Sequence, residues 1–190
     1  MEYLLLIVGA VLVNNVVLAQ FLGICPFLGV SNKISTATGM SAAVVFVMTL
    51  ATLVTWMVYH FLLAPLGIEF MQTISYILII ASLVQMVEII LKKTSPALYQ
   101  ALGVFLPLIT TNCVILGVAL LVIQKDYDLI TSTVYTIGTG LGYGLALIIF
   151  AGLREQLDLM SVPASFKGTP IALITAGILA MAFMGFAGMV

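Results

Sequence analysis

Residues 105–123 read FLPLITTNCVILGVALLVI. The segment is long and apolar enough for a membrane helix, which needs about 20 mostly apolar residues to cross the hydrocarbon core. Pro107 and the polar run Thr110-Thr111-Asn112 interrupt it directly before Cys113. Proline removes a backbone donor, and irregular backbone at membrane depth is tolerated only where protein buries it or it lines a cavity. The sequence therefore predicts a broken transmembrane helix with a thiol at the break.

A second interruption of the same kind lies near the N-terminus. Residues 13–27 read VNNVVLAQFLGICPF, with the pair Asn14-Asn15, then Gly23, then Cys25 directly before a proline. Cys25 and Cys113 are the only two cysteines of the chain. Each follows a polar break in an otherwise apolar segment, so we expect any chemistry of this protein to lie at these two breaks.

The composition places the whole chain in a membrane. It is 63% hydrophobic and 7% charged, against roughly 25% charged in soluble domains, and its mean hydropathy is +1.30. The alternation typical of β-strands is missing, so helices must satisfy the backbone. We predict an all-α integral membrane protein with six transmembrane helices, of which the first and fourth are broken: 3–24, 37–60, 71–91, 97–124, 129–153 and 169–189.

The chain also shows a faint internal repeat. Asn15-Val16-Val17-Leu18 resembles Asn112-Cys113-Val114-Ile115, 97 residues later. We predict a single membrane domain over 1–190, built from three-helix repeats over 1–95 and 96–190. An odd number of spans inverts the second repeat relative to the first, as in many transport proteins. Under this alignment Cys25 falls opposite Val122, so the symmetry would not extend to the thiols.

The basic residues predict an orientation. Positive charges favour the cytoplasmic side of a membrane protein. Loops after predicted spans 1, 3 and 5 carry five Lys or Arg residues, whereas the other loops and both tails carry one, Lys125. We therefore expect both termini on the outer side of a bacterial inner membrane. The start, Met1-Glu2-Tyr3, lacks a basic n-region and is predicted to begin a span rather than a cleaved signal. With a net charge of −1, no nucleic acid is expected as a partner.

The two cysteines have two interpretations. A free cysteine in a membrane helix usually behaves as a small hydrophobic residue. Alternatively, two thiolates can form part of a metal site, although an iron–sulfur cluster normally needs four ligands. The chain has no further cysteine and a single histidine, His60. The missing ligands would then come from a second copy or a different protein.

The other polar residues inside the predicted spans are also ambiguous. Asn14, Asn15, Thr110, Thr111 and Asn112 either satisfy broken backbone around a cofactor or ion path, or hydrogen-bond between helices. Glu88 is an ion-path candidate because it is an intramembrane acid. It also precedes Lys92 by four residues, which favours a helical ion pair.

Two further stretches are predicted to be structural. The run Gly138-Thr139-Gly140-Leu141-Gly142-Tyr143-Gly144 has small residues four apart, which favours close helix packing, and it lacks the context of a dinucleotide site. Arg154, Glu155 and Asp158 are expected in a solvated cytoplasmic loop. No catalytic triad, Walker loop or haem motif occurs, so no complete active site is expected in this chain.

With these motifs in view, the whole sequence resembles the RnfA/NqrE family, and within it the RnfA proteins of the bacterial Rnf complex. The resemblance rests on residues 13–27, on KTSPALY at 93–99, on FLPLITTNC at 105–113 and on IALITAG at 171–177. The NqrE proteins of the sodium-pumping NADH:quinone reductase share the same plan.

The resemblance implies a function that the composition alone could not indicate. It implies a membrane component of a ferredoxin:NAD oxidoreductase, a translocase coupled to Na⁺ or H⁺ movement. It also implies a homologous sister protein of opposite topology, RnfE-like, with the B, C, D and G components of the Rnf complex as further partners. The two sisters would share a [2Fe–2S] cluster, to which Cys25 and Cys113 would contribute two thiolates.

Two other classes of protein fit parts of the sequence. A small-solute secondary transporter with inverted repeats would explain the broken helices and polar residues but would give the cysteines no task. A purely structural component of a membrane complex would bind no metal through this chain.

Overall fold

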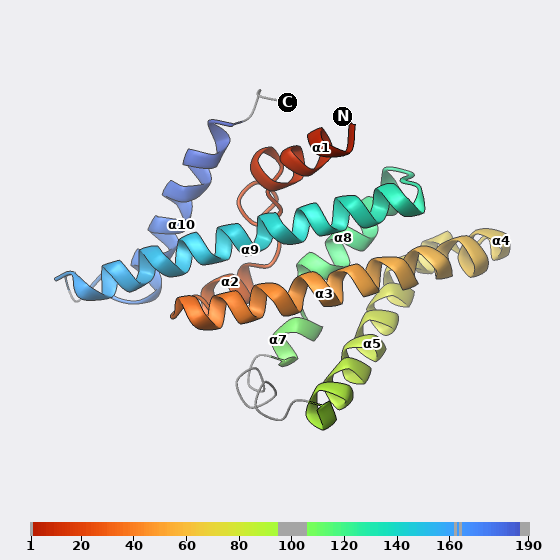
Figure 1. The fold of residues 1–190 in the computed structure, drawn as a ribbon, viewed down its shortest axis with the longest axis horizontal. Coiled ribbons are helices and arrows are strands. Elements are labelled where there is room, and N and C mark those ends of the chain that lie inside the picture. Colours follow the sequence, from red (N-terminus) through yellow and green to blue (C-terminus); the bar gives the residue numbers. More distant parts are fainter. Residues whose placement is uncertain (1, 95–105, 162, 164, 187–190) are drawn as a thin grey trace.

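The computed structural model describes residues 2–94, 106–161, 163 and 165–186. Within these ranges the chain forms helices and no sheet (Figure 1), as predicted. Three predicted stretches lie at least partly outside the described residues: most of the KTSPALY motif, the start of the span predicted over 97–124, and the end of the span predicted over 169–189.

The α-helices are α1 Glu2–Val8, α2 Ile24–Gly29, α3 Ile34–Val58, α4 Ala64–Leu66, α5 Gln72–Thr94, α7 Leu106–Thr110, α8 Cys113–Gln124, α9 Leu129–Leu159 and α10 Thr169–Met184. Three short helices of other types are also present in the described ranges: the π-helices η1 Gly9–Val13 and η2 Tyr59–Leu63, and the 3₁₀ helix η3 Glu69–Met71.

Four stretches of helix are long and apolar enough to cross a membrane: 34–66, 72–90, 107–124 and 129–159. Tyr3–Val13 and Thr169–Met184 are shorter apolar helices. The structure thus contains a helix at each of the six predicted spans. The first span stops being helical at Val13, where the predicted break begins.

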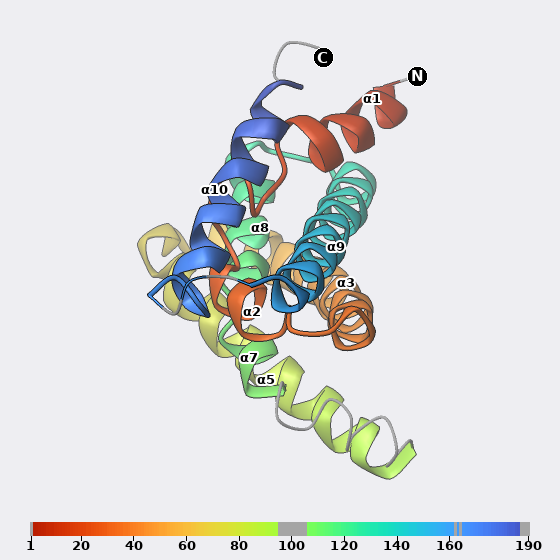
Figure 2. The same ribbon diagram turned by 90° about the vertical axis from the view of Figure 1, so that its left-hand side faces the viewer.

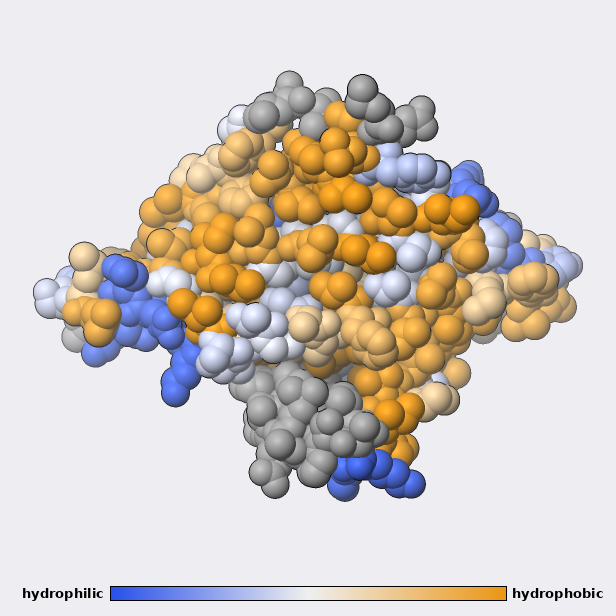
Figure 3. Space-filling model, in the orientation of Figure 1, coloured by the Kyte–Doolittle hydropathy of each residue, from blue (hydrophilic) through white to orange (hydrophobic). Residues whose placement is uncertain are grey.

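Helices α3 and α9 form the centre of the molecule and run antiparallel along its longest axis (Figure 1). Helix α8 packs against both, and α1 with η1 packs on α9. Figure 2 shows α5 leaving this group, with its C-terminal end far from α9. Apolar residues cover the visible face between hydrophilic residues at the ends of the long helices (Figure 3), as expected of a protein surrounded by lipid.

The glycines of α9 account for the close packing at the centre. A Cβ on Gly142 would lie 3.0 Å from Val11 Cα, and one on Gly140 would lie 2.9 Å from Val45 Cγ2. Gly138 and Gly142 therefore admit the α1–η1 segment, whereas Gly140 and Gly144 admit α3. Close backbone approach of this kind is how helices associate where no water drives them together. The packing interpretation of the glycine run is confirmed.

Two predicted helix ends were wrong. The span predicted to end at residue 60 continues through η2 and α4 to Leu66, and stops at Gly67, whose φ of 64° ends a helix readily. The span predicted to end at 153 continues to Leu159. Arg154, Glu155 and Asp158 therefore belong to α9 rather than to a loop, and the Arg154 guanidinium has hydrogen-bond partners on the segment that follows α2.

Candidate metal centre

Asn15 holds the first break together. The segment between η1 and α2 is irregular, and Asn15 is 1% exposed within it. Its Nδ2 donates to the carbonyls of Val11 (3.0 Å) and Gly142 (2.8 Å), and its Oδ1 accepts from the backbone N–H groups of Val17 (3.1 Å) and Leu18 (3.3 Å). One side chain thus bonds to three backbone groups at the break itself, and its bond to Gly142 ties the break to α9. Asn14, by contrast, is exposed.

The second break uses the same chemistry. Helix α7 ends at Thr110, and Asn112 caps α8 because its Oδ1 accepts from Val114 N (3.2 Å). The Thr111 hydroxyl donates to the carbonyl of Pro107 (3.0 Å). Asparagine is among the best N-cap residues. Asn15 and Asn112 therefore satisfy backbone groups at the two breaks, and Asn15 also bonds to the neighbouring helix α9. Both predicted roles are thus represented, and a cofactor or ion path beside these residues stays a prediction.

The structure brings the two breaks into contact. The backbone N–H of Gly23 donates to the Sγ of Cys113 at 2.9 Å, across 90 residues of sequence. Gly23 has φ +77°, and a Cβ there would lie 2.4 Å from Val114 Cγ2. Only glycine fits this approach without strain. Cys25 follows Gly23 by two residues, which span at most about 7 Å of chain, so both thiols belong to one region of the molecule.

The surroundings of Cys113 favour negative charge. Cys113 is the first residue of α8, a 12-residue helix, and a helix N-terminus acts as roughly half a positive charge. The Gly23 N–H points at the same sulfur. Both features direct backbone donors towards the sulfur, an arrangement that suits a sulfur bound to a metal.

The two thiols form at most half of a four-thiolate site. Both are exposed, and over the described ranges no three side chains of His, Cys, Asp or Glu gather to hold a metal ion. Exposed thiols beside backbone donors fit the donor set of an iron–sulfur cluster, provided that another chain completes it.

The other predicted site residues are Thr110, Thr111 and Glu88. Thr110 ends α7 and is half-buried, and Thr111 is exposed. Glu88 is half-buried on α5, outside both breaks, and its pairing with Lys92 stays a prediction.

The sequence did not predict a role at the breaks for two residues, Arg154 and Tyr143. Arg154 Nη1 donates to the carbonyl of Leu28 (2.7 Å) and to the Ser31 hydroxyl (2.8 Å), and so ties α9 to the segment that follows α2. Tyr143 is fully buried in α9, and its ring approaches Gly23. Its only signal in the sequence is a polar aromatic ring placed among glycines.

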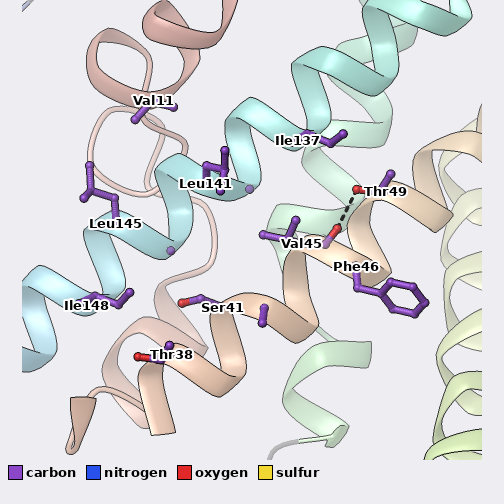
Figure 4. Close-up of a pocket in the computed structure, with 13 residues that line it drawn as sticks. Val11, Thr38, Ser41, Val45, Phe46, Thr49, Ile137, Leu141, Leu145 and Ile148 are labelled. Atoms are coloured by element: carbon purple, nitrogen blue, oxygen red, sulfur yellow. Dashed lines mark hydrogen bonds between the residues drawn. The ribbon is translucent and has the colours of Figure 1, made fainter. Parts of the chain in front are cut away.

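A groove of about 930 Å³ lies elsewhere, between α3, α9 and η1 (Figure 4). Apolar and small side chains line it, and neither cysteine is among them. The hydroxyls of Ser41 and Thr49 donate to carbonyls four residues earlier in α3. The groove therefore presents a largely apolar surface to the membrane and is separate from the thiol site.

Fold and site together define a polytopic helical membrane protein, with two broken helices that present paired thiols at its surface. Residues 3–190 match the family described as "Rnf-Nqr subunit, membrane protein", and the chain belongs to that family. It is 60% identical to the A component of the ion-translocating oxidoreductase complex of Syntrophotalea carbinolica, over 98% of this chain and 97% of the relative. It is 55% identical to the A component of the Na(+)-translocating ferredoxin:NAD(+) oxidoreductase complex of Acetobacterium woodii, over 100% of this chain and 98% of the relative. The family resemblance seen in the sequence is confirmed.

Proposed function

We propose that this chain is the RnfA component of an ion-translocating ferredoxin:NAD oxidoreductase complex, and that it conducts electrons through the membrane. Its Cys25 and Cys113 would hold half of a [2Fe–2S] cluster. A homologous RnfE-like protein of opposite topology would supply the other two thiolates. The observation that carries the proposal is the Gly23 N–H bond to Cys113 Sγ, because it joins the two broken segments and places both thiols in one exposed region.

The residues of this chain would act chiefly through charge. A bound [2Fe–2S] cluster supplies one-electron transfer. The Gly23 N–H and the N-terminus of α8 would offset part of the negative charge that thiolates and an added electron bring into a poorly hydrated site. Asn15 and Asn112 would keep the broken backbone in the shape that aims these donors.

The same charge argument suggests how electrons and ions could be coupled. An added electron near Cys113 would be stabilised by a cation close by, and electron arrival would then favour occupancy by Na⁺ or H⁺. We expect the cluster's reduction potential to depend on Na⁺ concentration or on pH. A potential that depends on neither would refute local coupling.

The repeats, the membrane orientation and the partner proteins that we propose are those predicted from the sequence. The two halves, 1–95 and 96–190, would be inverted repeats, each with one broken helix. The loops after spans 1, 3 and 5 would face the cytoplasm of a bacterial cell. The B, C, D and G components would complete the complex and hold its other cofactors.

Electron paramagnetic resonance tests the proposal directly. The chain would be co-purified with its sister protein, reduced with dithionite and analysed for iron. We expect a [2Fe–2S] signal that is lost in both Cys25→Ser and Cys113→Ser. Ser82→Ala, an exposed position on α5, serves as the control and should keep the signal. An intact pair without iron would overturn the proposal and favour the transporter or structural alternatives.

A further inference from the structure

Two buried polar groups beside Cys113 have no hydrogen-bond partner among the described residues: the Nδ2 of Asn112 and the hydroxyl of Tyr143. Asn112 is 3% exposed and Tyr143 is 0% exposed. An unpaired buried donor costs about 1–3 kcal/mol. Because buried polar groups are nearly always paired in native proteins, each exception calls for a reason.

The side chains that carry both groups lie close to Gly23. A Cβ placed on Gly23 would be 3.1 Å from Cε2 of Tyr143 and 3.3 Å from Oδ1 of Asn112. Gly23 is also the residue whose N–H reaches Cys113 Sγ. The Tyr143 and Asn112 side chains therefore both adjoin the residue that bonds the Cys113 sulfur.

Both of these groups can donate a hydrogen bond. The Oδ1 of Asn112 is already engaged by the N–H of Val114, so its unused half is the NH₂ group, which can only donate. The Tyr143 hydroxyl can donate as well. Together with the Gly23 N–H and the α8 N-terminus, they make the surroundings of Cys113 rich in donors, which is an arrangement suited to accumulating negative charge.

We propose that Tyr143 and Asn112 are positioning residues for electron transfer: their free donors stabilise the reduced state of the iron–sulfur cluster held at Cys113 and so raise its reduction potential. The inference rests on the proposed function. Hydrogen bonding near the sulfurs is one of the factors that set the potentials of such clusters.

The test is a redox titration of the cluster, followed by paramagnetic resonance, in the co-purified pair of sister proteins. Tyr143→Phe removes only the hydroxyl. Asn112→Ser removes the amide donor and keeps a good N-cap for α8. Tyr135→Phe is the matched control, because Tyr135 is a buried tyrosine of the same helix, eight residues or roughly 12 Å from Tyr143.

We expect the cluster potential to become more negative in Tyr143→Phe and in Asn112→Ser, and to stay at the wild-type value in Tyr135→Phe. A wild-type cluster whose potential is unshifted in both variants overturns this inference and leaves the proposed function standing. A wild-type pair without a cluster overturns the proposed function, and this inference with it.

Discussion

Gly23→Ala is the substitution for which the structure gives the most definite expectation. The new methyl group would lie 2.4 Å from Cγ2 of Val114, a residue that is fully buried in the first turn of α8. The φ of +77° adds a strain of about 1–2 kcal/mol for any residue with a Cβ. Relieving an overlap in a packed core costs about 1–3 kcal/mol more. We therefore expect a loss of about 2–5 kcal/mol in the free energy of unfolding.

The overlap also points to a double-variant experiment. Val114→Ala removes the atom that the new methyl group would meet, so Gly23→Ala should cost about 1–3 kcal/mol less in that background. The φ strain should remain. Gly29→Ala is the control, because Gly29 is the last residue of α2 and a Cβ there would meet nothing within 4 Å. We expect it to be neutral or slightly stabilising.

The assay is unfolding of the co-purified pair in mixed micelles with increasing sodium dodecyl sulfate, monitored by circular dichroism. The reasoning is refuted if Gly23→Ala unfolds at the same detergent fraction as Gly29→Ala. It is also refuted if Val114→Ala does not reduce the cost of Gly23→Ala, since the contact would then not be the cause.

Three further substitutions follow from the contacts of the breaks. Asn15→Ala removes the four hydrogen bonds of this buried side chain and should destabilise the chain by about 3 kcal/mol or more, whereas Asn14→Ala should be near neutral; equal effects in the same unfolding assay would contradict this. Arg154→Met removes two charge-assisted bonds to the segment after α2 and should cost about 2–4 kcal/mol. It should also speed alkylation of Cys25 by a maleimide, and an unchanged rate would argue against this link. Gly142→Ala places a Cβ 3.0 Å from the backbone of η1 and should cost about 1–3 kcal/mol; a variant as stable as wild type would show that the contact is looser than described.

The parts of this protein that sequence predicted well are those with a local signal. Asparagines at positions 15 and 112 stand out in apolar surroundings, and both lie at breaks in the structure. Small residues four apart in the glycine run fix two packing faces of one helix, because that spacing returns to the same side of a helix. Such features need only neighbouring residues to be recognised.

The parts that it missed depend on distant segments. The Gly23 bond to Cys113 spans 90 residues, and no local pattern indicates it. Arg154 suggested a solvated loop, since charged residues usually leave the membrane. Instead α9 continues, and the guanidinium has carbonyl and hydroxyl partners on another segment. In the sequence Tyr143 stands only as a member of the glycine run, and its burial depends on how α9 packs against distant segments.

The unequal helix lengths have a consequence for the surrounding lipid. Helix α9 has 31 residues, or roughly 46 Å of helix, whereas the apolar helices Tyr3–Val13 and Thr169–Met184 span roughly 17 and 24 Å. A hydrocarbon core of about 30 Å matches none of them. Hydrophobic mismatch is relieved by tilting long helices and thinning the bilayer beside short ones. Lipids beside the α1 and α10 side of this protein should therefore be compressed, so the stability of the chain should vary with the acyl-chain length of the membrane that holds it.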